Sequence, residues 1–253
     1  MSTDNKHKNG DSNKGRIRRG FENDRKIKSD KHNIKRLSQD EENGRIAGGS
    51  RNVTATEYLR GHESAVYEKQ EDRLIEWARD NHCLFTIKEI EEEFGAEIFE
   101  DLQRKYGSES PKSGAESCIY QYDENHLLKV MRYNVFDTKP LGFLDNRIAL
   151  HNYLFPDTDY QLIGLCRRGK AGKFSFIMRQ PYIKGVRPSD EDIFVEMKKR
   201  GFSRDYIENT TYFSKDYIIR DLHTGNWIKG NNGKMYCIDP APSLNISRRY
   251  NNI

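Results

Sequence analysis

Large apolar side chains are distributed unevenly along this chain of 253 residues, and this limits how much of it can fold. Few of them occur in residues 1–60, whereas residues 115–240 are rich in Ile, Leu, Val, Phe and Tyr. A segment that buries little apolar surface cannot offset the entropy lost when its backbone is ordered. The sequence therefore predicts a packed core of roughly 130–150 residues, preceded by a disordered basic arm over residues 1–62.

Charge is concentrated in that arm. Residues 1–40 carry twelve Lys or Arg against six Asp or Glu, a net charge of +6 in a chain whose total is +4. Such an arm can make weak contact with nucleic acid or another polyanion, or it can only keep the chain soluble, and the sequence leaves both open.

The expected location follows from apolar runs and cysteines. No signal peptide is visible in the given sequence and no run of about twenty apolar residues occurs in it, so no membrane contact is expected. The widely spaced cysteines predict reduced, mostly buried thiols in a cytosolic protein; they are Cys83, Cys118, Cys166 and Cys237.

Hydrophobic periodicity predicts an α+β fold. A helical lead-in over residues 63–106 should precede two β-hairpins with one helix between them, and a capped helix and short strands should follow. The expected helices cover 64–79, 86–107, 142–154 and 189–201, and the expected strands cover 117–122, 127–133, 161–167, 174–179, 216–222, 226–229 and 234–238.

The segment 218–226 and Asp239, thirteen residues after it, point to a chemistry. Transfer of a phosphoryl group to a hydroxyl requires a carboxylate that accepts the hydroxyl proton, and oxygen ligands that hold Mg²⁺ on the nucleotide phosphates. Asp221 on the loop after one strand, Asn226 five residues later and Asp239 after the next hairpin supply that set. The hairpin should fold Asp239 back towards Asn226.

These residues resemble a known catalytic loop. Arg220, Asp221 and Leu222, with Asn226 and Asp239 after them, resemble the catalytic loop and metal-binding Asp of protein kinases. His223 and the Gly225–Asn226 pair make the loop similar to that of aminoglycoside and choline phosphotransferases. Upstream, Lys129 resembles the phosphate-binding lysine, and a degenerate glycine-rich loop precedes its strand; that loop consists of Ser113, Gly114, Ala115, Glu116 and Ser117.

A wider resemblance covers residues 68–245. The chain is similar to the kinase-like domains of polyvalent proteins from conjugative elements and phages of Bacteroidetes, through the segments 76–83, 113–117, 154–156, 188–193, 199–202, 221–223, 238–240 and 244–245. The resemblance implies a two-lobed kinase-like fold that binds ATP and Mg²⁺. It assigns these roles: Asp221 as catalytic base, Asn226 and Asp239 as Mg²⁺ ligands, Lys129 and the loop 113–117 on the phosphates, and Gln180 and Tyr182 beside the adenine. It does not define the phosphate acceptor.

The same resemblance predicts a small lobe over about 107–179 and a reduced large lobe over 180–253. Only fourteen residues follow Asp239, and Pro240 stands where protein kinases have Phe. The helix over 142–154 has no Glu to brace Lys129, and Asp145 is its one acidic residue.

Three functional hypotheses remain open from the sequence. The first is an ATP- and Mg²⁺-dependent phosphotransferase that acts on a protein or small-molecule hydroxyl. The second is a catalytically dead kinase fold that serves as a nucleotide-binding or interaction module. The third is a nucleic-acid-associated accessory protein of a mobile element, which acts through its basic arm. Asp221 and Asn226 can also be read as residues that only cap turns.

Overall fold

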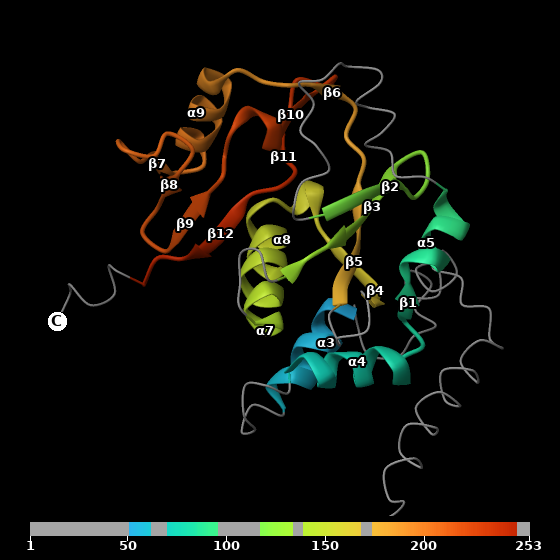
Figure 1. The fold of residues 1–253 in the computed structure, drawn as a ribbon. Helices are drawn as coiled ribbons and strands as arrows, with labels where there is room; N and C mark the ends of the chain where they lie inside the picture. Colours follow the sequence, from blue (N-terminus) through green and yellow to red (C-terminus); the bar gives the residue numbers. More distant parts are fainter. Residues whose placement is uncertain (1–50, 62–69, 96–116, 134–138, 168–173, 247–253) are drawn as a thin grey trace, which may run out of the picture. The chain divides into compact units, whose positions relative to one another are not determined.

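The computed structural model of the chain describes residues 51–61, 70–95, 117–133, 139–167 and 174–246 (Figure 1). They form an α+β fold with two separate clusters of buried apolar side chains. Within these ranges no helix has both the length and the apolar character needed to cross a membrane. Residues 1–50 and the predicted loop residues Ser113, Gly114, Ala115 and Glu116 lie outside the described part of the chain.

A five-stranded sheet organises the first core, with strand order β1-β4-β5-β3-β2. Its strands are β1 (Leu84–Thr86), β2 (Ser117–Gln121), β3 (His126–Met131), β4 (Gln161–Arg167) and β5 (Phe174–Pro181). Both predicted hairpins are confirmed, because β2 pairs antiparallel with β3 and β4 with β5. Since β5 lies in the middle of the sheet, its residues 174–180 are all buried.

The edge strand β1 was not predicted. It pairs parallel with β4, and Leu165 N donates a hydrogen bond of 2.8 Å to Cys83 O. Gly164 permits this close approach, because a Cβ at that position would lie 2.2 Å from the same oxygen. A strand of three residues that depends on such a distant contact leaves no periodic signal in the sequence.

The prediction that residues 1–62 are disordered is wrong for their last part. Residues Arg51–Arg60 form helix α3, which buries Ala55 and Leu59 in the first core. The Asn52 side chain donates to Tyr160 O at 2.8 Å and accepts from Leu162 N at 2.6 Å. These bonds satisfy backbone groups at the start of β4, so α3 belongs to the fold.

Two helices of the predicted lead-in are present. Helix α4 (Gln70–Asp80) buries Leu74 and Trp77, as its broken apolar stripe suggests. Helix α5 (Ile87–Phe94) begins with the predicted capping box, in which Thr86 and Glu89 satisfy each other's backbone N–H groups. It ends before Gly95, which has a φ of 79°, so the predicted helix does not continue unbroken past this residue, and residues 96–107 lie outside the described part of the chain.

A single helical run covers residues 140–154, close to the predicted 142–154. It consists of α7 (Pro140–Gly142), a π-helical stretch η4 (Phe143–Ala149) and α8 (Leu150–Leu154). The π register shows in the bond from Leu150 N to Asp145 O, five residues back. Phe143, Leu144 and Ile148 of this run pack into the first core.

The second core consists of Phe155 and of residues that follow the first sheet in sequence. Helix α9 (Asp190–Lys199) has the predicted cap at Ser189, completed by the Asp192 carboxylate, and it buries Ile193 and Met197. It is the only α-helix in the described residues 174–246, as expected for a reduced lobe.

Short strands complete this part of the fold. The predicted β9 (Tyr217–Arg220), β10 (Trp227–Gly230) and β11 (Met235–Cys237) are joined by the unpredicted β6 (Gly185–Val186), β7 (Ser203–Arg204), β8 (Tyr212–Phe213) and β12 (Ala241–Leu244). They pair in two sheets, β11-β10-β6 and β12-β9-β8-β7.

Candidate active site

The loop after β9 holds Asp221 in an unusual conformation. Asp221 has a φ of 63°, in the left-handed region that non-glycine residues rarely adopt. The Asn226 Nδ2 donates to both the backbone O and the Oδ2 of Asp221, each at 2.8 Å. A strained residue held in this way costs of order 1–3 kcal/mol and persists only where its surroundings fix it, which is common at functional sites.

The next hairpin places Asp239 beside this loop. Trp227 in β10 pairs with Cys237 in β11, and Ile238 N donates to Asn226 O at 2.9 Å. The residue that follows Ile238 is Asp239, so the predicted return of the hairpin towards Asn226 is confirmed.

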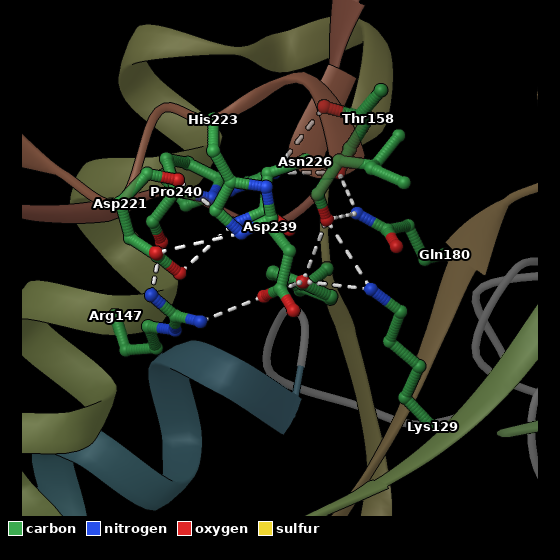
Figure 2. A network of polar contacts seen from close by, with 12 residues as sticks. Lys129, Arg147, Thr158, Gln180, Asp221, His223, Asn226, Asp239 and Pro240 are labelled. Carbon is green, nitrogen blue, oxygen red and sulfur yellow. Dashed lines mark hydrogen bonds and ion pairs between the residues drawn. The ribbon is translucent and has the colours of Figure 1, made fainter. Parts of the chain in front are cut away.

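Lys129 reaches the same place from the five-stranded sheet. Its side chain, 3% exposed, donates from Nζ to Tyr160 Oη and to Ile238 O, both at 3.2 Å. Figure 2 shows Lys129, Gln180 and Arg147 directed towards the segment that carries Asp239. Residues from both cores therefore meet in one polar network.

Opposing effects set the charge state of this network. Burial alone would raise the pKa of Asp239, but Lys129 and Arg147 outweigh it and hold that pKa below its usual value. Burial lowers the pKa of Lys129, and Asp239 partly opposes that change. The Asp239 carboxyl is therefore ionised at neutral pH and faces two basic side chains.

His151 is buried beneath the network as a neutral ring. Its Nε2–H donates to Thr158 O at 2.7 Å, whereas its buried Nδ1 has no hydrogen-bond partner in the described part of the chain. Burial, reinforced by the charges of Lys129 and Arg147, lowers the pKa of His151 to about 3. Protonation would create a buried donor at Nδ1 without an acceptor.

This pKa predicts a loss of stability in acid. Between about pH 6.5 and pH 3 the unfolded chain binds a proton on His151 that the folded chain does not, so stability falls as pH falls through this window. Protonation of His151 in the unfolded chain should therefore lower the free energy of unfolding by about 2 kcal/mol between about pH 6.5 and pH 5. Urea unfolding of the wild type and His151→Gln at about pH 7 and pH 5 measures this, because glutamine can donate to Thr158 O but does not titrate. Equal losses in the two proteins would contradict the assignment.

Comparison with known families agrees with this geometry. The profile of the family described as serine/threonine/tyrosine kinase found in polyvalent proteins matches residues 67–245, which is more than half of the chain. The chain belongs to this kinase family. No curated protein and no solved structure matches it. Membership places the chain among kinase-like phosphotransferases and agrees with its α+β fold.

In this chain, the helix over 140–154 contributes a cation where protein kinases have a glutamate. Asp145 accepts from Arg60 Nη2 at 2.7 Å on the surface, so this ion pair joins it to α3 and not to Lys129. Arg147, which is 4% exposed, donates instead to Asp239 Oδ1 at 2.7 Å and to Pro240 O. The sequence reasoning missed Arg147, although its position on the apolar stripe with Phe143, Leu144 and Ile148 signals a buried charge.

Two other residues of the polar network were also not predicted as site residues. Tyr160 donates to Ile238 O at 2.9 Å and lies 3.2 Å from Asp239 Oδ1, and no motif marks it in the sequence. His223 lies in the recognised motif. Its Nδ1 accepts from Gly225 N at 3.0 Å, which leaves Nε2 3.5 Å from Asp221 Oδ1.

The predicted adenine-side residues have structural partners. The Gln180 side chain is buried and donates to Thr158 O at 2.9 Å and to Ile238 O at 3.0 Å, so it supports the segment before Asp239. Tyr182 N donates to Asn125 O at 2.6 Å, so this N–H is not available to a base while the contact persists. Ser117 begins β2 opposite Met131, and the rest of the 113–117 loop lies outside the described residues.

Proposed function

We propose that this chain transfers the terminal phosphoryl group of Mg²⁺-ATP to a hydroxyl acceptor. The observation that carries the proposal is that Lys129, Asp221, Asn226 and Asp239, which three different sheets position, are joined at one place by hydrogen bonds. Each of these residue types supplies something that phosphoryl transfer requires.

The oxygen donors of the site suit Mg²⁺. Asp239 Oδ2 and Asn226 Oδ1 have no hydrogen-bond partner in the described part of the chain, and both are hard oxygen ligands. The described residues contain no group of three or more His, Cys, Asp or Glu side chains placed to hold a metal ion. The remaining ligands would therefore be phosphate oxygens and water, as is usual for Mg²⁺ on a nucleotide. The bound ion would neutralise charge on the phosphates.

Each residue of the site would have its own role in the reaction. Asp221 accepts the proton of the acceptor hydroxyl as the new P–O bond forms, while the bond from phosphorus to the ADP oxygen breaks. Asn226 holds the Asp221 carboxylate through its Nδ2. Lys129 supplies a buried positive charge to the phosphates. None of the four cysteines, all within the described residues, forms a disulfide, which supports a reducing cytoplasm as the place of this activity.

A thermal-shift titration tests the nucleotide and the metal. The wild type should be stabilised by ATP with Mg²⁺, since a ligand that binds only the folded state raises the unfolding temperature. In Asp239→Asn the part of the shift that depends on Mg²⁺ should disappear. Each shift is measured against the same variant without ligand, because removing the carboxylate between two cations also lowers stability.

The matched control for this titration is Asp157→Asn. The Asp157 side chain makes an exposed ion pair with Lys234 at 2.7 Å and is not one of the proposed ligands of nucleotide or metal, so the variant should respond to ligand like the wild type. An unchanged Mg²⁺-dependent shift in Asp239→Asn would argue against the metal assignment, and no shift in the wild type would argue against the proposed function.

A specific observation favours one alternative function. Arg147 pairs with Asp239, and within the described residues no carboxylate forms an ion pair with Lys129. Both observations suit a module that binds a nucleotide but does not catalyse phosphoryl transfer. Turnover by Asp221 variants separates the two functions.

A further inference from the structure

The Asp221 carboxylate has a side-chain nitrogen near each of its two oxygens (Figure 2). Asn226 Nδ2 donates to Oδ2 at 2.8 Å, and His223 Nε2 lies 3.5 Å from Oδ1. The Asp221 side chain is 42% exposed, so packing does little to hold it. A carboxylate that is bound at one oxygen can still pivot about that contact, whereas a second contact at the other oxygen fixes its plane.

The loop itself decides which nitrogen of His223 carries the hydrogen. Nδ1 accepts a hydrogen bond from Gly225 N at 3.0 Å and thereby caps the short 3₁₀ helix η6 (Thr224–Asn226). A neutral imidazole has one donor and one acceptor nitrogen, so the hydrogen is on Nε2. Protonation of the ring would leave the Nε2 hydrogen in place. An N–H donor therefore faces Asp221 Oδ1.

Gly225 makes room for this ring. A Cβ at residue 225 would lie 2.8 Å from Cε1 and 3.0 Å from Nδ1 of His223. The backbone of Gly225 does not have the positive φ that favours glycine; among the described glycines, that conformation occurs at Gly95, Gly201 and Gly233. The glycine therefore serves the position of the imidazole and not the course of the chain.

We propose that His223 is a positioning residue for phosphoryl transfer, whose Nε2–H orients the Asp221 carboxylate towards the acceptor hydroxyl. His223 has this role only if Asp221 is the base, so the inference rests on the proposed function. As the new P–O bond forms and the bond from phosphorus to the ADP oxygen breaks, the hydroxyl proton passes to a remaining lone pair of Asp221. The ring of His223 keeps its own hydrogen throughout.

The separation of 3.5 Å is longer than a good hydrogen bond. Catalytic hydrogen bonds are often long in a free enzyme and tighten only in the complex. Binding of the acceptor should therefore shorten this contact, because it excludes the water that competes for the half-exposed carboxylate.

Two substitutions separate this role from simple capping of η6. In His223→Asn the amide oxygen can take the place of Nδ1 and accept from Gly225 N, since asparagine is a good N-cap residue, but no donor remains at the position of Nε2. In His223→Gln the amide nitrogen can reach the position of Nε2, whereas the acceptor at Nδ1 is lost. A residue that only caps the turn should tolerate Asn better than Gln, and a positioning residue should show the reverse order in kcat.

Initial rates of transfer from labelled Mg²⁺-ATP to the full chain itself, to casein and to water measure this order, with kcat and KM for ATP taken separately. His223→Asn should lower kcat at least about tenfold, because displacing a catalytic group by about 1 Å can cost about a hundredfold. Its KM for ATP should stay unchanged, since the proposed nucleotide contacts are intact. His223→Gln should keep a higher kcat than His223→Asn, although it should unfold at a lower urea concentration.

The matched control is His82→Asn. His82 is exposed and lies outside the site, and its φ of 52° is one that asparagine tolerates. This variant should keep the kcat and the KM of the wild type.

A second measurement needs no turnover. In ¹⁵N NMR spectra of the histidine-labelled full chain in alkaline buffer, the signal that either His223 variant removes should belong to a ring with its hydrogen on Nε2. A ring with its hydrogen on Nδ1 would overturn the inference. So would wild-type kcat in His223→Asn, or a kcat in His223→Gln as low as in His223→Asn. These three results leave the proposed function standing. The function falls, and the inference with it, if the wild type transfers phosphate no faster than Asp221→Asn to all three acceptors.

Discussion

Asp221→Asn should lower phosphoryl transfer at least roughly a hundredfold, the usual scale for losing a general base. Asparagine has the shape of aspartate and still offers an oxygen to Asn226 Nδ2, which now donates to Asp221 Oδ2 at 2.8 Å. The loop should therefore keep its conformation, and Mg²⁺-ATP should bind nearly as before. Only the capacity to accept the proton of the acceptor hydroxyl is removed.

The measurement is transfer from labelled ATP, to the chain itself and to a panel of hydroxyl acceptors. Asp216→Asn is a suitable control, since Asp216 is exposed and precedes the same strand, β9, that delivers Asp221 at its other end. The control should retain wild-type transfer. If the wild type binds Mg²⁺-ATP but transfers phosphate no faster than Asp221→Asn on every acceptor, the chain is a nucleotide-binding module and not an enzyme.

Removing residues 1–60 should destabilise the fold by at least about 3 kcal/mol, because truncating even one buried leucine typically costs 2–5 kcal/mol. The deletion removes Ala55 and Leu59 from the first core. It also removes the Asn52 side chain that satisfies Tyr160 O and Leu162 N. Tyr160 is itself part of the polar network, so nucleotide binding should weaken as well.

The matched deletion removes residues 1–50 and keeps α3. On the sequence prediction that the early part of the arm buries little apolar surface, this chain should unfold within a few tenths of a kcal/mol of the full one. Denaturant unfolding of the full chain and both deletions makes the comparison. Equal stability of the two deletions would show that α3 contributes nothing to the core.

Local patterns predicted the elements whose causes are local. Alternation of apolar residues identified both hairpins of the five-stranded sheet, since a strand face repeats every two residues. The caps at Thr86 and Ser189 were visible because a capping box joins residues only three apart. The return of Asp239 to Asn226 was equally visible, because a short hairpin connects them.

Long-range packing decided what the sequence reasoning missed. Helix α3 carries only a weak apolar pattern, and its place is set by Tyr160 and Leu162, more than a hundred residues away in sequence. Helix α5 ends early because of Gly95. The sequence prediction missed this end because apolar residues continue at helical spacing beyond Gly95. Strand β1 forms because it can pair with β4, where Gly164 has no Cβ to block the close approach.

The candidate site also has features that the sequence predicted and features that only the tertiary structure decided. By itself the sequence determined the residue types that phosphoryl transfer needs, because Asp221, Asn226, Asp239 and Lys129 stand in recognisable order and spacing. Only the tertiary structure decided their partners: Arg147 on Asp239, Tyr160 on Lys129, and Arg60 on Asp145. The physical reason is that a motif fixes chemistry within one loop, whereas the charge balance of a buried site depends on side chains that distant elements bring to it.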